Sequence, residues 1–157
     1  MPVNSERVKS YWTVIRSPGW LCFAWFGMTA GISLLEAPVK FTAPLLSRVA
    51  ALDVGRVVFA ALNKAELVAL VLLLVLVRTS GMARALWAAV GALVLIMLAQ
   101  SVWLLPELAS RAQQIASGVE PPASYAHGAY AVLELSKLIL LLVIGFRSLV
   151  PSTTPRG

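Results

Sequence analysis

The sequence predicts an all-α integral membrane protein, a four-helix bundle with short interfacial amphipathic helices, and three observations lead to this fold class. Apolar residues make up 59% of the 157 residues and charged residues only 13%, whereas soluble domains carry about 45–50% and about 25%. The mean hydropathy is +0.84. Four separate stretches are each long and apolar enough to cross a bilayer, which takes about 20 helical residues. These observations exclude a soluble enzyme and a disordered chain, and the single cysteine, Cys22, excludes a disulfide scaffold.

The four predicted spans cover approximately residues 20–39, 57–77, 85–105 and 125–146. Backbone groups in hydrocarbon must be hydrogen-bonded internally, so each span must be a helix. Residues 1–157 are therefore expected to form a single membrane domain. The last residues, 149–157, contain two prolines and are expected to be a disordered tail.

Segments outside the spans predict short helices at the membrane surface. Residues 8–15 are amphipathic and lie beside basic residues, as in helices that rest on an anionic leaflet. After the first span, Pro38 and Pro44 are expected to break the helix. The apolar face of residues 43–53 is then expected to rest on the outer surface or to cap the bundle. Residues 106–124 are expected to form a surface excursion that is partly helical.

Charged residues flank the spans unevenly. The side that holds both termini has one acid, Glu6, and seven basic residues: Arg7, Lys9, Arg16, Arg78, Arg84, Arg147 and Arg156. The opposite side carries as many acids as bases. The positive-inside rule therefore predicts a multi-pass protein of a bacterial-type inner membrane with both termini in the cytoplasm. The same distribution explains the pI of about 10.1 without nucleic-acid binding, so the expected environment is the lipid bilayer.

Polar side chains inside the spans are the most informative feature of the sequence. A charged group near the bilayer centre costs about 2.5–3.5 kcal/mol, so such groups must be paired, hydrated or protonated. The fourth span places four polar residues on a stripe about 80° wide: His127, Tyr130, Glu134 and Lys137. The other spans carry polar residues at a similar depth: Glu36, Lys40, Asn63, Lys64, Glu66, Gln100 and Ser101. All four helices are thus expected to contribute to one polar region in the outer half of the bilayer.

Two interpretations of this region stay open. In the first, the region is a cleft open to the outer side that binds a small solute, a cation or a lipid headgroup, or relays protons. Its lining would be Glu36, Asn63, Lys64, Glu66, Gln100, His127, Tyr130, Glu134 and Lys137. The two span glutamates would bind cations or share a proton, and the two span lysines would balance their charge. In the second, Lys137 pairs with Glu66 or Glu134, Lys64 extends outward, and the set only holds helices together or contacts a membrane partner. The chain is then a non-catalytic assembly or scaffold subunit.

Small residues in the first and third spans predict close helix packing. Gly27 and Gly31 form a GxxxG motif, and Ala88, Gly91 and Ala92 give the third span a face of small residues. The alternative to packing within the chain is a homodimer that forms through these glycines. A faint internal repeat also exists, because residues 66–77 and 134–145 align without gaps at an offset of 68. Leucine-rich spans match by chance, so only the pairing of the two glutamates is informative.

Sequence motifs for catalysis and for cofactors are absent. The chain has one histidine, which excludes an internal bis-histidine haem. It lacks HExxH, paired CxxC, GxGxxG and the phosphate loop. A lipid-modifying enzyme would need His127 as a base beside Ser101 or Tyr130, but no third group is placed to orient it. We therefore expect no enzymatic activity, no cofactor and no metal.

Short motifs over the first two spans and at the start of the fourth resemble those of a known family. Ala37-Pro38-x-x-Phe41, followed by Arg48, Gly55 and Phe59, resembles the opening motif of the four-span membrane proteins related to transmembrane protein 205. The pair His127-Gly128 is similar to a His-Gly pair of that family, and Glu134 stands where the family often has Asn. The resemblance implies a four-helix membrane fold and draws attention to Pro38, Phe41, His127 and Glu134. It implies no substrate.

Overall fold

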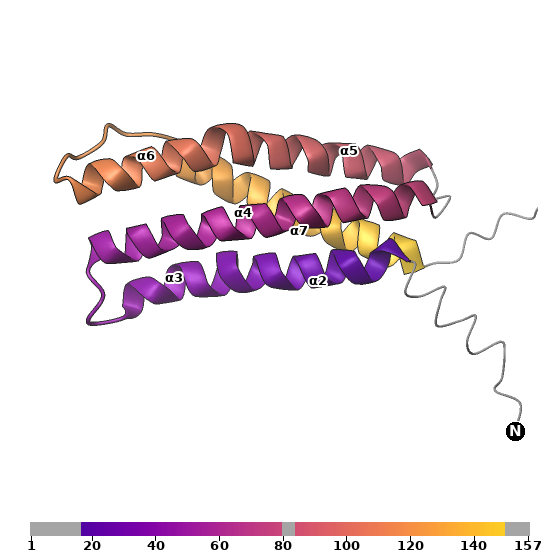
Figure 1. Cartoon of the computed structure of the whole chain (residues 1–157), viewed down its shortest axis with the longest axis horizontal. Helices are drawn as coiled ribbons and strands as arrows, with labels where there is room; N and C mark the ends of the chain where they lie inside the picture. Colours follow the sequence, from indigo (N-terminus) through magenta and orange to yellow (C-terminus); the bar gives the residue numbers. More distant parts are fainter. Residues whose placement is uncertain (1–16, 80–83, 150–157) are drawn as a thin grey trace, which may run out of the picture.

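The computed structural model describes residues 17–79 and 84–149. Within these ranges the chain forms helices and no strand, and it has four helices long and apolar enough to cross a membrane. The predicted all-α four-helix membrane bundle is therefore confirmed. The four helices lie lengthwise beside one another (Figure 1).

Two of the spans are single helices and two are composite. The second span is α4 (Arg48–Thr79) and the fourth is α7 (Ala126–Leu149). The first span, Pro18–Thr42, joins four elements: α2 (Pro18–Ala30), η1 (Gly31–Glu36), α3 (Ala37–Val39) and η2 (Lys40–Thr42). The third span, Leu86–Ala116, lies within three: α5 (Arg84–Ala99), η3 (Gln100–Leu104) and α6 (Leu105–Ala116).

The helices extend further than hydropathy predicted at the end of the bundle that holds α3 and α6, here called the α3/α6 end. Residues 43–53 do not form a separate surface helix, because α4 begins at Arg48 and continues through them. The predicted excursion at 106–124 begins as α6, a direct continuation of the third span. Hydropathy marks only the residues that suit hydrocarbon, whereas a helix can continue into water where polar neighbours stabilise it. In α4, Arg56 pairs with Asp53 at 2.7 Å.

Pro38 does not break the first span. It lies in α3, two residues after the π-helical segment η1, and the helix continues to Thr42. Pro106 has the same relation to the π-helical segment η3 in the third span. Proline lacks an N–H and its ring crowds the carbonyl four residues earlier, so a wider π turn just before it lets the helix pass without a break.

The helices pack in a ring in the order α2, α4, α5 with α6, and α7, and α7 closes the ring against α2. In this order α2 lies diagonally across from α5, and α4 lies diagonally across from α7. The contact between α2 and α7 is the most extensive. There Gly19 of α2 faces the backbone of Gly145 of α7, which allows the two helices to approach closely.

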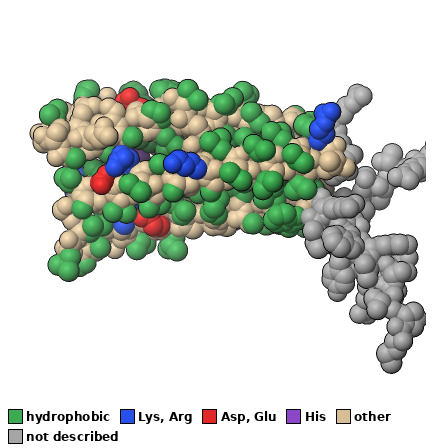
Figure 2. Space-filling model, in the orientation of Figure 1, with side chains coloured by type: hydrophobic (Ala, Val, Ile, Leu, Met, Phe, Trp, Pro, Cys, Tyr) green, Lys and Arg blue, Asp and Glu red, His purple; other side chains and the backbone are tan. Residues whose placement is uncertain are grey.

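An apolar core fills the half of the bundle away from the α3/α6 end. Its fully buried members come from all four spans: Cys22, Trp25, Leu73, Val77, Val90, Leu93, Met97, Leu141 and Ile144. Many large hydrophobic side chains also lie on the outside of the helices. Figure 2 shows that hydrophobic side chains cover the visible face over this half, while acidic side chains gather toward the α3/α6 end. An apolar exterior suits a lipid environment.

Several predictions from the sequence fall on residues outside the described ranges. They are the amphipathic segment 8–15, the basic residues Arg7, Lys9, Arg16 and Arg156, and the tail from residue 150 onward. The first residue of the expected tail, Leu149, still belongs to α7.

Candidate functional site

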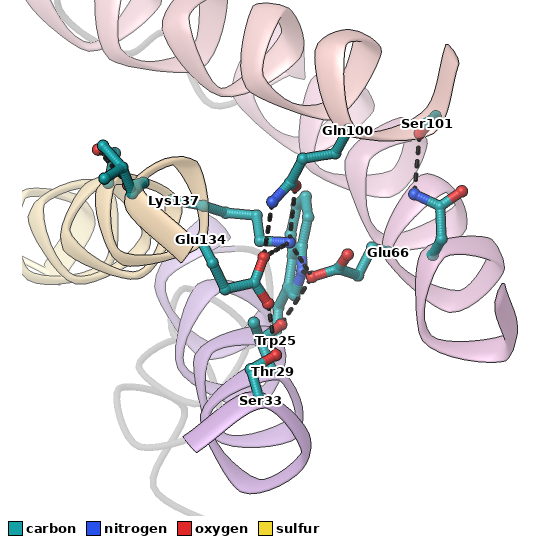
Figure 3. Close-up of polar contacts among 11 residues, drawn as sticks. Trp25, Thr29, Ser33, Glu66, Gln100, Ser101, Glu134 and Lys137 are labelled. Carbon is teal, nitrogen blue, oxygen red and sulfur yellow. Dashed lines mark hydrogen bonds and ion pairs between the residues drawn. The ribbon is translucent and has the colours of Figure 1, made fainter. Parts of the chain in front are cut away.

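A cluster of buried polar side chains lies between the four spans and forms the candidate site (Figure 3). We call it the buried cluster, and its members are Trp25, Thr29, Ser33, Glu66, Gln100, Glu134 and Lys137. Apart from the buried Tyr130, all the buried polar and charged residues that the structure describes belong to it. Each span contributes at least one member.

Lys137 is the centre of the buried cluster. Its ammonium lies 2.7 Å from Oε1 of Glu66 and 2.8 Å from Oε2 of Glu134. It also donates to the side-chain carbonyl of Gln100 at 3.1 Å. An ammonium group has three N–H donors, so these three acceptors use all of them. The Lys137 side chain is 0% exposed, and the charge is therefore compensated entirely by protein groups.

Glu66, on α4, accepts its hydrogen bonds from the first span. Thr29 donates its hydroxyl to Oε1 at 2.8 Å, and the indole N–H of Trp25 donates to the same atom at 3.0 Å. Together with Lys137, three donors meet on this single carboxylate oxygen. A carboxylate taken out of water needs such partners, because burial without them costs several kcal/mol.

Glu134, on α7, uses both of its oxygens. Ser33 of η1 donates to Oε1 at 2.6 Å, and the amide of Gln100 in η3 donates to Oε2 at 2.7 Å. Each of the two π-helical segments thus supplies one donor to the same carboxylate. Tyr130 is buried one turn away on α7, with its ring edge-on to Phe59 at a centroid distance of 5.7 Å.

Two carboxylates and one ammonium leave one negative charge in excess when all three groups are ionised. The exposed fractions of the Glu66, Glu134 and Lys137 side chains are 1%, 4% and 0%, so water does not screen this charge. No buried side-chain nitrogen or oxygen lacks a partner in the part of the chain that the structure describes. The geometry therefore forms a closed network that can take up one more positive charge. Metal-ligand groups of three His, Cys, Asp or Glu are absent among the described residues.

Four of the nine residues predicted to line the site lie outside this network, and a fifth, Tyr130, borders it beside Glu134. Asn63 forms a neighbouring pair instead, donating to Ser101 at 2.8 Å. Glu36 pairs with Lys40 at 3.4 Å, near the α3/α6 end. Tyr130 packs beside the cluster. His127 and Lys64 are both exposed on the outside of the bundle.

The exposure of Lys64 contradicts the first interpretation, in which two lysines balance the two glutamates, and agrees with the second, in which Lys64 points outward. Lys64 lies two residues from Glu66, which on a helix turns it by about 200° to the opposite side. Lysines on the outside of a span commonly extend their ammonium toward the membrane surface. Lys137 therefore serves both carboxylates.

The predicted open cleft differs from the structure in a second respect. Glu66, Glu134 and Lys137 are enclosed rather than facing a cleft. An open groove of about 590 Å³ lies at the α3/α6 end, between α6 and the segment before α7. Its lining includes Trp103, Glu107, Arg111, Ser124 and Tyr125 and none of the residues predicted for the site.

The glycines predicted to pack helices do not do so within this chain. A Cβ built at Gly27, Gly31 or Gly91 meets no atom within 4 Å, and all three residues are exposed. The close approach occurs instead at Gly19 and Gly145, neither of which belongs to a GxxxG motif. A motif shows where a helix has a smooth face but not which face meets a neighbour.

Sequence reasoning also missed the contribution of the first span to the site. Trp25, Thr29 and Ser33 recur at intervals of four residues and so lie on one helix face. This spacing was available as a signal. Hydroxyl and indole groups are common in spans, however, so their presence alone does not indicate a polar site.

The comparisons with known proteins bring no relative. No protein-family model matches the chain, and neither a curated protein nor a solved structure matches it significantly. The similarity to the proteins related to transmembrane protein 205 therefore depends only on the short motifs around Pro38 and His127.

Proposed function

We propose that this multi-pass membrane protein binds and releases one proton at the buried cluster and couples this exchange to the movement of a small solute or cation across the bilayer. The observation that carries the proposal is the excess negative charge at Glu66, Glu134 and Lys137, enclosed by all four spans. A net charge in a low-dielectric interior is costly, and one proton removes it. Buried ionisable groups inside membrane helices are typical of proton pathways.

Oε2 of Glu66 is the favoured position for the proton. The three donors that reach Glu66 all meet on Oε1, whereas Glu134 accepts bonds on both of its oxygens. A neutral Glu66 still accepts on Oε1 and leaves Glu134 paired with Lys137. Among the described residues, Tyr130 is a further titratable group that interacts with the charges of Glu66 and Glu134.

The π-helical segments supply a route from proton binding to a conformational change. Ser33 lies in η1 and Gln100 begins η3, and both donate to Glu134. Single π turns within α-helices are rare and are frequent at functional sites. A change in the charge of the carboxylates changes the strength of the hydrogen bonds that Ser33 and Gln100 donate. Each of the two π-helical segments is followed by a proline, so this change favours bending of the first and third spans.

Infrared spectroscopy of the purified protein tests the proposal by detecting the carboxyl proton. We expect a C=O stretching band from one protonated, buried carboxyl at neutral pH, which disappears reversibly as the pH is raised. The band is expected to vanish in both Glu66→Gln and Glu134→Gln, because either amide makes the cluster neutral without a proton. Glu120→Gln, which changes an exposed acid, is the matched control and keeps the band. A wild-type protein without such a band over its stable pH range would refute the proposal.

We further propose that the protein lies in an inner membrane with both termini in the cytoplasm, which places the α3/α6 end outside. A single cysteine introduced as Val119→Cys, in a Cys22→Ser background, is then expected to react in intact cells with a membrane-impermeant maleimide. Val119 is exposed in the segment between α6 and α7. The control is Thr79→Cys at the opposite end of the bundle, which is expected to react only after lysis. The reverse labelling pattern would invert the proposed topology.

An assembly subunit is the second candidate function, and the exposed glycine face of the first span favours it. Gly27 and Gly31 pack against nothing in their own chain, so a helix that fits this face must come from a second copy or another membrane protein. Co-purification of one stoichiometric membrane partner that is lost in Gly31→Leu would support this function. Retention of a proton-dependent activity by the isolated chain would favour the first.

A further inference from the structure

Burial in the first half of the chain recurs 68 residues later, the spacing between Glu66 and Glu134. The pairs buried in both halves are Cys22 and Val90, Trp25 and Leu93, Thr29 and Met97, Leu62 and Tyr130, Glu66 and Glu134, Ala69 and Lys137, Leu70 and Leu138, Leu73 and Leu141, and Val77 and Gly145. Most of these pairs differ in residue type, so shared leucine content does not explain the agreement. The agreement reflects how the helices are turned toward one another.

Local irregularities of the backbone recur at the same spacing. Pro38 and Pro106 are 68 residues apart, and each follows a π-helical segment by two residues. Ser33 and Ser101 are also 68 residues apart. Each of these serines contacts the second helix of the other half, Ser33 through Glu134 and Ser101 through Asn63.

The arrangement of the helices fits two units related by an approximate two-fold axis. One unit is the first span with α4, and the other is the third span with α7. Such an axis exchanges α2 with α5 and α4 with α7, and these are the two diagonal pairs of the bundle. Figure 3 shows the same relation at the site, where Glu66 faces Glu134 from across the bundle and Gln100 lies across from Trp25 and Thr29. Both units pass through the bundle in the same sense, so the axis runs along it.

Lys137 breaks this symmetry at the site. Its counterpart is Ala69, and each of the two follows its own glutamate by three residues. The Lys137 ammonium lies almost equally far from the two symmetry-related carboxylates, at 2.7 and 2.8 Å. We infer that the buried cluster is a two-fold cation site whose cation is the chain's own ammonium, and that the site binds a small primary ammonium ion when this ammonium is removed.

The ligand class follows from the acceptors around the ammonium. They are Oε1 of Glu66, Oε2 of Glu134 and the side-chain carbonyl of Gln100, which match the three N–H groups of a primary ammonium. Truncating Lys137 to alanine vacates three methylene groups and the ammonium, which together have the shape of n-propylammonium. A quaternary ammonium has the same charge but no N–H donor, so it cannot replace these contacts.

Ligand-dependent unfolding of the full-length Lys137→Ala protein in detergent tests the inference. We expect n-propylammonium to raise the Tm of this variant in a saturable manner and to leave the wild type unchanged. Tetramethylammonium at equal concentration is the control for ionic strength and is expected to have no such effect. Should Lys137→Ala fail to fold alone, n-propylammonium present during purification is expected to restore a folded protein. Equal effects of the two ions, or no effect of either, would overturn the inference.

A lysine moved to the symmetry-related position provides the second test. The Ala69→Lys/Lys137→Ala double variant is expected to regain most of the Tm lost in Lys137→Ala, because the new ammonium approaches the same carboxylates from α4. Leu70→Lys/Lys137→Ala is the matched control, since Leu70 is as buried as Ala69 but turned by about 100° on the helix. It is expected to regain nothing. A double variant at Ala69 that is no more stable than its control would overturn the two-fold assignment.

Discussion

Replacing Lys137 by methionine is expected to lower the free energy of unfolding by about 3–5 kcal/mol. Methionine fills a similar volume, so the loss comes from charge rather than from a cavity. Glu66 and Glu134 lose the ammonium that lies within 2.8 Å of both, and two buried carboxyl groups are left without a cation to compensate their charge. Unfolding in mixed micelles, followed by circular dichroism against SDS concentration, measures the difference.

Two further variants connect this loss to the buried charges. Lys64→Met removes the same charge from an exposed position on α4 and is expected to change the stability little. Adding Glu66→Gln to Lys137→Met is expected to restore part of the loss, since one of the two buried carboxyl groups can then no longer carry a charge. Contacting residues couple in this way, whereas independent ones add. Equal losses from the two lysine variants would show that the ammonium of Lys137 does not stabilise the bundle.

The spans and the main charged members of the site could be predicted from the sequence for one physical reason. Hydrocarbon excludes uncompensated charge and unpaired backbone, so long apolar stretches become helices and their few charges must meet. Glu66, Glu134, Lys137 and Gln100 do meet, and every span contributes to the cluster. These constraints come from the lipid and not from the packing of the helices, so they can be applied to the sequence without a structure.

The side that each helix presents to its neighbours could not be predicted in the same way. Asn63, Lys64 and Glu66 lie within one turn of α4, yet one pairs with Ser101, one is exposed and one joins the cluster. The rotation of α4 decides among them, and packing against the other three helices sets that rotation. The enclosure of the site also depends on packing, because it requires the surfaces of the four spans to fit tightly around the cluster.

The lengths of the helices were underestimated because hydropathy measures the fit to lipid and not the fit to a helix. The first turns of α4 contain Arg48, Asp53 and Arg56, and α6 contains Glu107 and Arg111. Both segments are too polar for hydrocarbon. Ion pairs between residues one turn apart, such as Glu107 with Arg111 at 3.9 Å, nevertheless allow these segments to stay helical outside the hydrocarbon.

Replacing Gly145 by leucine is expected to lower the free energy of unfolding by about 1–3 kcal/mol, because it overpacks the contact between two helices. A Cβ at this position would lie 3.0 Å from the ring of Phe23 and 3.4 Å from Cβ of Cys22, in the most extensive helix contact of the bundle. Phe23 already packs edge-on against Phe146 at a centroid distance of 5.0 Å, so its ring has little freedom to move away. The helices α2 and α7 must therefore separate, which the same SDS titration would detect.

Gly27→Leu is the matched control. It makes the same change in α2, the helix that packs against Gly145, at a position where a Cβ meets nothing within 4 Å. We expect it to leave the unfolding of the isolated chain unchanged. The two variants together distinguish a glycine that lets two backbones approach from a glycine that only lies in a motif. A greater loss from Gly27→Leu than from Gly145→Leu would mean that the GxxxG face is the packed one, and that the close crossing of α2 and α7 does not hold the bundle together.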